Sequence, residues 1–282
     1  MAAVAVTGAR GKTGRAIIRA VRDAGLDACA APRPYRFPPV DAVYFIAPNL
    51  HPDEPGLVED ALEAARAAGV GRFVYHSVAW PYCPEMPHHL AKAEAERLVR
   101  ASGLDWTILQ PCAYFQNFAG VIGGDTHAIE LPYSPDSRFA FIDLDDVAAV
   151  AAGMLADGTG RHRNATYELG GPEALSVAEL AAACGAHYGV PVDIRRVHPP
   201  AGDEAADQAD GPGPGSRLAA MFEFYDTTGF AIGGGVAGWL LGRPAHALAD
   251  LLAGRSPADV DGYSEPDPSE FDITEARPKT LG

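Results

Sequence analysis

The chain opens with an apolar run that leads directly into three regularly spaced glycines. Residues 4–15 read VAVTGARGKTGR, in which Gly8, Gly11 and Gly14 have the spacing G-x-x-G-x-x-G. A strand, a glycine turn and a helix start form a pyrophosphate site, because N–H groups and the positive end of the helix dipole face the anion. Gly8 allows the sharp turn, Gly11 leaves room for a phosphate and Gly14 lets the helix approach the strand. An ordinary strand-to-helix turn is the alternative interpretation.

Strand-like and helix-like segments alternate through the first two thirds of the chain. This alternation predicts an α/β fold with a doubly wound parallel, Rossmann-like sheet. The expected strands are 3–7, 27–31, 41–47, 72–77, 105–109, 139–142, 167–169 and 192–197, and the expected helices are 12–24, 54–68, 87–101, 143–156, 176–188, 216–228 and 244–253.

The segments group into three parts. Residues 1–156 are the expected dinucleotide-binding domain, and residues 157–254 are a smaller C-terminal substrate lobe interleaved with it. Residues 199–215 are rich in Pro, Gly, Ala and Asp, which predicts a long loop. The tail, 255–282, has seven acidic residues, three basic residues and four prolines, which predicts an extended segment.

Charge is unevenly distributed along the sequence. The formal net charge is -15, which argues against a nucleic-acid partner because phosphate repels an acidic surface. The first 36 residues nevertheless carry an excess of basic groups. Those at 15, 19 and 22 have the spacing of a solvated helix face. The better candidates for phosphate contacts are Arg10, Lys12, Arg33 and Arg36, and the glycine turn also places Thr13 beside the anion.

Cysteine usage and hydropathy indicate the cellular compartment of the protein. The four cysteines (Cys29, Cys83, Cys112, Cys184) have no metal-ligand spacing and are expected to be free thiols in a reducing environment. We expect no bound metal. The first strand begins almost at Met1, and the most apolar late segment, 229–242, is too short to span a bilayer. These features predict a cytoplasmic protein with no membrane partner.

Eight blocks of the sequence follow one another in a characteristic order. They are TGARGKTGR, DAVYFIAPN, RFVYHSVA, HHLAKAEAERLVRASGLDWTILQPCAYFQNF, DLDDVAAVAAGML, YELGGPEALSVAELA, FEFYDTTGF and WLLGRPAHALADLL. In this order they resemble the NmrA-like family of atypical short-chain dehydrogenases/reductases, over almost all of residues 1–253. The resemblance implies a dinucleotide cofactor and a substrate lobe built from the C-terminal blocks.

The sequence departs from that family after the second strand. Only seven residues separate Arg33 from Asp41, where the family has a helix and a further strand. A helix of about ten residues and a strand of about five do not fit in this length. We therefore expect the edge helix and strand to be missing. That region walls one side of the adenosine site, so its loss puts normal cofactor affinity in doubt.

The resemblance implies three catalytic candidates: Ser77, His88 and Lys92. Typical members of the superfamily carry Tyr-x-x-x-Lys on this helix, and here His88 and Lys92 keep the i, i+4 spacing with His in place of Tyr. The family role implies that Lys92 holds the nicotinamide ribose or donates a proton, and His88 is able to exchange one. The alternative is a solvated helix start in which Lys92 pairs with Glu96. Ser77 ends its strand at the carboxyl edge, where it either bonds a substrate carbonyl or caps the turn.

Further lining residues follow from the same comparison. The loop 111–117 resembles the segment near the nicotinamide, which implies that Phe115 packs on that ring. Tyr114 and Asn117 would contact substrate, unless Tyr114 and Phe115 are core residues. Three residues that end the middle strand are expected to line the adenine or ribose side: Ala47, Pro48 and Asn49. Neighbouring His76 should point to the opposite sheet face from Ser77 and act structurally.

Aromatic residues suggest the kind of substrate. Trp80 and Tyr82 lie in a Pro-rich loop before the Lys92 helix, and Phe222, Phe224 and Tyr225 lie in the C-terminal lobe. If these two sets converge, they suit a flat, aromatic or polyketide-like molecule of secondary metabolism.

The cofactor and the function remain open between named alternatives. The second strand is followed by Ala31-Pro32-Arg33 and no acid, which favours NADP(H) over NAD. The first hypothesis is an NADPH-dependent oxidoreductase of a small organic molecule. The second is a non-redox enzyme (a cyclase, isomerase, dehydratase or coupling catalyst) with a vestigial cofactor site, and the third is an NADP(H)-sensing regulator. The acidic tail is also compatible with a homodimer in which it bridges two subunits.

Overall fold

A six-stranded parallel sheet forms the centre of the molecule. The computed structural model describes residues 2–198 and 214–254. Its strands lie in the order β2-β1-β3-β4-β5-β8. They are β1 (Ala3–Val6), β2 (Asp27–Ala30), β3 (Ala42–Phe45), β4 (Arg72–His76), β5 (Asp105–Pro111) and β8 (Ala165–Leu169). The order reverses at β1 and β3, so their carboxyl ends form the switch point at which α/β sheets bind ligands.

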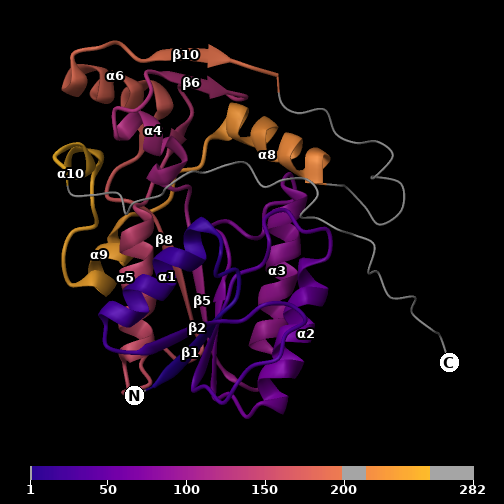
Figure 1. Cartoon of the computed structure of the whole chain (residues 1–282). Helices are drawn as coiled ribbons and strands as arrows, with labels where there is room; N and C mark the ends of the chain where they lie inside the picture. The colour runs from indigo at the N-terminus through magenta and orange to yellow at the C-terminus, as the bar shows by residue number, and fades with distance from the viewer. Residues whose placement is uncertain (1, 199–213, 255–282) are drawn as a thin grey trace.

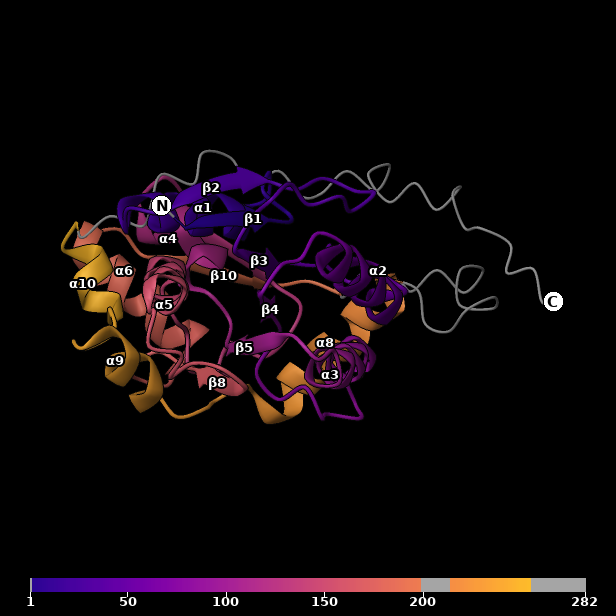
Figure 2. The ribbon, with the colours of Figure 1, turned by 90° about the horizontal axis from the view of Figure 1, so that it is seen from below.

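Helices cover both faces of this sheet, which confirms the doubly wound fold. Helices α1 (Lys12–Asp23) and α5 (Leu144–Ala156) pack together on one face, and α2 (Glu54–Ala67) and α3 (Pro87–Arg100) on the other. Figure 2, which views the sheet from its end, shows the three layers. Strands β3 and β4 are almost wholly buried because helices lie on both sides of them.

The predicted loss of an edge helix and strand is confirmed. Residues 31–41 contain neither a helix nor a strand, and β2 is left at the edge of the sheet. The loop instead places Tyr35 and Phe37 on the sheet face, where the Tyr35 ring meets Phe45 at 5.5 Å. Two aromatic rings therefore cover part of the surface that a helix would otherwise bury.

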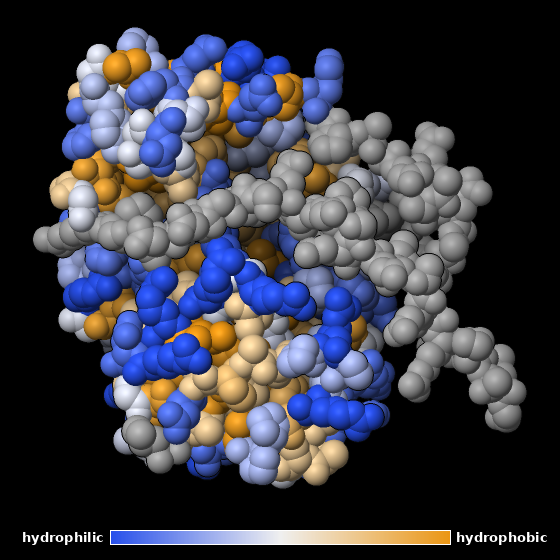
Figure 3. All heavy atoms as spheres, viewed as in Figure 1, coloured by the Kyte–Doolittle hydropathy of each residue, from blue (hydrophilic) through white to orange (hydrophobic). Residues whose placement is uncertain are grey.

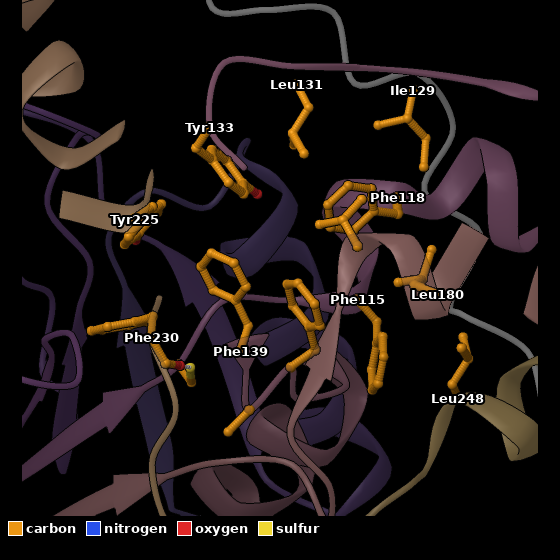
Figure 4. Close-up of a cluster of buried hydrophobic side chains, with 14 of the residues drawn as sticks. Phe115, Phe118, Ile129, Leu131, Tyr133, Phe139, Leu180, Tyr225, Phe230 and Leu248 are labelled. Atoms are coloured by element: carbon orange, nitrogen blue, oxygen red, sulfur yellow. Dashed lines mark hydrogen bonds between the residues drawn. The ribbon is translucent and has the colours of Figure 1, made fainter. Parts of the chain in front are cut away.

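The remaining elements form a second, smaller lobe above the carboxyl edge (Figure 1). Two short sheets pair β10 (Asp193–Arg196) with β6 (Ala128–Leu131), and β7 (Arg138–Phe139) with β9 (Leu175–Ser176). Its helical segments are η1 (Phe115–Phe118), α4 (Ala119–Ile122), α6 (Val177–Tyr188), α8 (Pro214–Thr228) and α10 (Leu248–Leu252). Figure 4 shows the buried cluster at its centre, where the Phe139 and Tyr225 rings lie 5.0 Å apart.

Several predicted boundaries are wrong in this lobe. The expected strand 139–142 is the two-residue β7, and α8 begins at Pro214, inside the predicted loop. The expected helix 244–253 begins only at Leu248, because the His246 amide donates to Asp146 Oδ2 at 2.6 Å and holds the chain outside helical geometry. Helix α9 (Gly235–Leu241), which packs on α5 and β8, was not predicted. The rest of the predicted loop and the tail lie outside the described residues.

Candidate functional site

The glycine turn has the close packing that its spacing predicts. Gly8 has φ +61°, a conformation that favours glycine, and the Gly11 amide donates to the Gly8 carbonyl at 3.0 Å. A Cβ on Gly14 would lie 2.2 Å from Gly8 O, so only glycine lets α1 approach the turn this closely. A Cβ on Gly11 would meet only Gly8 O, at 3.4 Å, so its outer side is open.

The start of α1 offers donors to an anion. Its N-cap, Gly11, provides no side-chain hydrogen bond, and the first turn contains no acidic residue. The first backbone N–H groups of a helix have no partner within the helix, so these amides are suited to phosphate oxygens. Arg10 and Arg33 are exposed beside this end of the sheet. These features fit a dinucleotide phosphate.

Lys12 spans from α1 to the loop after β5. Its Nζ lies 2.9 Å from Asn117 Oδ1 and 5.7 Å from the centre of the Tyr114 ring. Burial lowers the pKa of this ammonium to about 8, because the charged form loses water contacts. The structure thus brings the predicted phosphate ligand Lys12 together with the predicted substrate residue Asn117. Figure 3 looks onto this region and shows hydrophilic side chains gathered over α1.

Tyr114 and His76 form a buried chain of hydrogen bonds under the turn. His76 Nε2 lies 2.8 Å from the Tyr114 hydroxyl and its Nδ1 lies 2.7 Å from the Tyr44 hydroxyl. The Tyr114 hydroxyl also bonds the side chain of Thr13 in the first turn of α1. Burial lowers the pKa of His76 to about 3, so this ring is neutral. The predicted structural role of His76 is confirmed, and Tyr114 ties the turn to the sheet.

Ser77 lies on the opposite sheet face and bonds a buried carboxylate. Its hydroxyl donates to Glu96 Oε1 at 2.6 Å, and the Gln110 amide donates to the same oxygen at 2.7 Å. Arg100 pairs with Glu96 Oε2 at 2.9 Å. Ser77 is almost fully buried in this arrangement. Its role toward a substrate carbonyl stays a prediction.

Lys92 pairs with a residue that sequence reasoning missed. Its Nζ lies 2.8 Å from Glu54 Oε1, which also accepts the Tyr75 hydroxyl at 2.5 Å. The alternative interpretation, in which Lys92 pairs with Glu96, does not hold, because Ser77, Gln110 and Arg100 bind that carboxylate and Lys92 binds Glu54. Glu54 is the first residue of α2, and an acidic residue at this position is common because it interacts favourably with the helix dipole. The sequence therefore gives no sign that it has a further partner. Only the fold reveals that it faces Lys92.

His88 and His89 are buried at the start of α3. In the described part of the chain, His88 Nδ1 and His89 Nε2 have no hydrogen-bond partner. His89 Nδ1 lies 2.9 Å from the Trp80 carbonyl oxygen. Burial, together with the nearby charges of His89, Lys92 and Arg217, lowers the pKa of His88 to about 2. His88 is therefore neutral near pH 7, which weakens the prediction that it acts as an acid.

The two predicted aromatic sets meet. The Trp80 ring lies 6.1 Å from Phe224 of α8 and 5.4 Å from Phe230. Tyr82 is 69% exposed and takes no part in this contact. Phe115 is fully buried in the core cluster of Figure 4, so its contact with a nicotinamide stays a prediction.

The loop after β3 lies beside the glycine turn. The Thr7 hydroxyl bonds both the amide and the carbonyl of Ile46, at 2.7 and 2.9 Å, and so joins the ends of β1 and β3. Ala47 and Pro48 are half-buried and Asn49 is exposed directly after this link. The contact of these three residues with the adenine or ribose stays a prediction.

One cluster has the composition of a cation site. Asp143, Asp146 and His246 place ligand atoms within 4.8 Å of one another. Their oxygens already accept from other groups: Gln116 donates to Asp143 at 2.6 Å and Arg243 pairs with Asp146 at 2.6 Å. These contacts join the start of α5 to the segment before α10, so we interpret the cluster as structural.

No helix in residues 2–198 and 214–254 is long and apolar enough to cross a membrane. The four cysteines are free, as expected, and three of them are buried.

A comparison with family models identifies the chain. Residues 39–233 match the model of the NmrA-like family. The chain belongs to the NmrA-like family. The matched part begins after the glycine turn and contains Ser77, Lys92 and helix α8, so the predicted resemblance is confirmed on the residues around the carboxyl edge.

Individual relatives agree with this membership. The chain is 32% identical to an NAD(P)H azoreductase of Xenophilus azovorans over 227 residues, 78% of this chain and 77% of the relative. It is 29% identical to a (4-alkanoyl-5-oxo-2,5-dihydrofuran-3-yl)methyl phosphate reductase of Streptomyces griseus, over 90% of this chain and 98% of the relative. The NADPH-dependent quinone oxidoreductase of Escherichia coli, solved with NADPH, shares the fold with a TM-score of 0.71 at 20% identity, over 89% of this chain and 99% of that one.

Proposed function

We propose that this NmrA-like protein is an NADPH-dependent oxidoreductase of a small organic molecule. The observation that carries the proposal is the position of the Lys92 ammonium, which Glu54 fixes at the carboxyl edge of the sheet. The glycine turn, whose helix has no side-chain cap, lies at the carboxyl edge of the same sheet. The azoreductase and phosphate-ester reductase relatives support redox chemistry. When bound, NADPH supplies a hydride.

The residues of this chain would bind and orient both reactants. The amides of residues 12–14 and the exposed Arg10 would hold the phosphates, and Arg33 would attract the 2′-phosphate that distinguishes NADPH from NADH. Lys92 would hold a proton at Nζ and donate it to the reduced substrate. His88 is not suited to this proton transfer because burial lowers its pKa to about 2.

A cofactor titration tests this proposal. We expect the purified protein to bind NADPH more tightly than NADH in a fluorescence titration, and Arg33→Ala to weaken NADPH binding alone by about tenfold. Turnover is then measured as the loss of NADPH with azo, quinone and enone acceptors. The absence of any NADPH binding at millimolar concentration would contradict the proposal.

The shortened adenosine side supports a second candidate, a non-redox enzyme on the same scaffold. Residues 31–41 supply neither the helix nor the strand that walls this side in the family pattern. Conversion of a substrate without NADPH, and without any change in its oxidation level, would favour this candidate. NADPH-dependent turnover would exclude it.

A further inference from the structure

We propose that this protein forms a homodimer through the free edge of β2, where the β2 strands of two copies pair in antiparallel orientation and join the two sheets. Strand β2 (Asp27–Ala30) is the first in the sheet order, and Figure 2 shows it at the outer end of the layers. The common doubly wound order has a further strand beyond this position, which the short segment after Arg33 does not supply. This interface does not depend on the proposed function, and no cofactor is needed to test it.

The hydrogen bonds of β2 show which of its backbone groups face outward. The amides of Asp27 and Ala31 donate to carbonyl oxygens along the β1 segment, at 3.1 and 2.9 Å. Backbone groups of alternate residues point to the same side of a strand, so those of Ala28 and Ala30 face away from β1. The Arg22 guanidinium of α1 bonds the Ala28 carbonyl oxygen at 2.9 Å on this outer side.

The outer edge of β2 lacks the features that usually keep an edge strand from pairing. Such strands commonly carry lysine, proline or a bulge. This strand reads Asp-Ala-Cys-Ala, and no other strand of the described residues lies on its outer side. A hollow of about 450 Å³ lies beside it, with Arg22, Leu26 and Ala28 among its lining residues. A carbonyl oxygen accepts two hydrogen bonds, so the Arg22 contact leaves Ala28 able to accept another.

One antiparallel register uses every outward backbone group of the strand. When Ala28 pairs with the partner's Ala30, the two residues exchange N–H···O bonds, and twofold symmetry repeats the exchange. The symmetry axis then passes between Cys29 and the partner's Cys29, which form a pair without backbone hydrogen bonds. The Cα atoms of such a pair lie about 4.5 Å apart. A disulfide joins Cα atoms that are about 4.4–6.8 Å apart, so this register permits one.

The charges beside β2 favour antiparallel over parallel pairing. Asp23 and Asp27 are exposed at its amino end, and Arg33 and Arg36 are exposed after its carboxyl end. The one base near the amino end of the strand, Arg22, is held by a backbone carbonyl. Antiparallel pairing places each end of the strand beside the opposite end of the partner, where acids face bases. Parallel pairing would bring like charges together. The edge is therefore complementary to a second copy of itself.

Sedimentation velocity of the full chain measures its mass in solution, and we expect a dimer at micromolar concentration. Ala30→Pro removes an outward N–H that takes no part in pairing with β1, so it should weaken dimerisation by about tenfold or more. Ala30→Ser keeps this N–H and is the matched control. Arg36→Glu should also weaken the dimer, by about fivefold, whereas Arg36→Lys should not. Far-UV circular dichroism checks that each variant is folded.

Oxidation with copper phenanthroline tests the register. Cys29 is half-buried, whereas the other three cysteines are buried. We expect a disulfide-linked dimer from the wild-type protein, none from Cys29→Ser and an unchanged amount from the control, Cys83→Ser. A monomeric wild-type chain, a wild-type dimer that does not cross-link through Cys29, or an undiminished dimer in folded Ala30→Pro protein would overturn the inference. If Ala30→Pro does not fold, Arg36→Glu and the cross-link still decide.

Discussion

Lys92 Nζ lies 2.8 Å from Glu54 Oε1, and this ion pair joins α3 to the first turn of α2 across the carboxyl ends of β3 and β4. The side chains are 17% and 4% exposed, so water screens the pair weakly. The Tyr75 hydroxyl donates to the same carboxylate oxygen, and the Lys92 ammonium lies over the Tyr75 ring, 5.8 Å from its centre. The pair therefore fixes a cation where parallel sheets place their ligands.

Replacing Lys92 should separate catalysis from folding. We expect Lys92→Met to lower kcat by about 100-fold or more, because the proton donor is lost. Glu54→Gln keeps an acceptor but releases Lys92, so we expect a smaller loss, about tenfold, in kcat rather than KM. Arg97→Met, on the exposed face of the same helix, is the control. Wild-type kcat in folded Lys92→Met protein would contradict this role.

Cofactor binding should depend on pH through Lys12. Its ammonium, with a pKa of about 8, is charged below that pH and neutral above it. The dissociation constant for NADPH should therefore rise as pH increases through about 8, by about fivefold for the loss of one half-buried charge. Lys12→Arg should remove this dependence, because arginine stays charged. If the dissociation constant of the Lys12→Arg protein rises with pH in the same way, the pH dependence belongs to another group.

Acid should destabilise the protein through its buried histidines. The folded-state pKa of His88 is about 2, below its ordinary 6.5, so between these values the unfolded chain binds more protons. The free energy of unfolding should therefore fall as pH decreases through 6.5, by about 1.4 kcal/mol per pH unit for each such group. Urea titrations at several pH values should show a shallower fall for His88→Gln than for His187→Gln, in which the replaced histidine is exposed.

Two glycine-to-alanine substitutions should have opposite effects on stability. A Cβ on Gly14 would lie 2.2 Å from Gly8 O, so Gly14→Ala should destabilise by about 2–4 kcal/mol and weaken cofactor binding. Gly153, inside α5, has no atom within 4 Å of its added Cβ. Gly153→Ala should stabilise by up to about 1 kcal/mol, because it restores helix propensity. Urea unfolding measures the free energy of unfolding of both variants, and equal changes in that free energy would contradict the prediction.

Local patterns were sufficient for much of the fold. Apolar runs with the correct lengths predicted the strands of the main sheet, and the seven residues after Arg33, compared with the family pattern, predicted the missing edge elements. The alternation of side chains along β4 placed His76 and Ser77 on opposite faces, as their partners Tyr114 and Glu96 confirm. The strands and the facing of side chains depend only on neighbouring residues, whereas the missing elements were recognised against the family pattern.

Contacts between distant segments were not predictable in this way. Helix α9 is rich in glycine, and its packing on α5 and β8 compensates for its poor intrinsic preference. Asp146 accepts a hydrogen bond from the amide of His246, 100 residues later in the sequence, and so holds the segment before α10 out of helical geometry. No local pattern carries this information.

The sequence by itself determined the scaffold: a glycine turn at a parallel sheet, a shortened edge after β2, the strand that Ser77 follows and the helix that carries Lys92. Only the tertiary structure decided the partners of these side chains. Glu54 meets Lys92 across 38 positions, and Glu96 is occupied by Ser77 and Gln110. The physical reason is that strand and helix periodicity fixes which face a residue occupies, whereas packing of separate elements decides which charge meets it there.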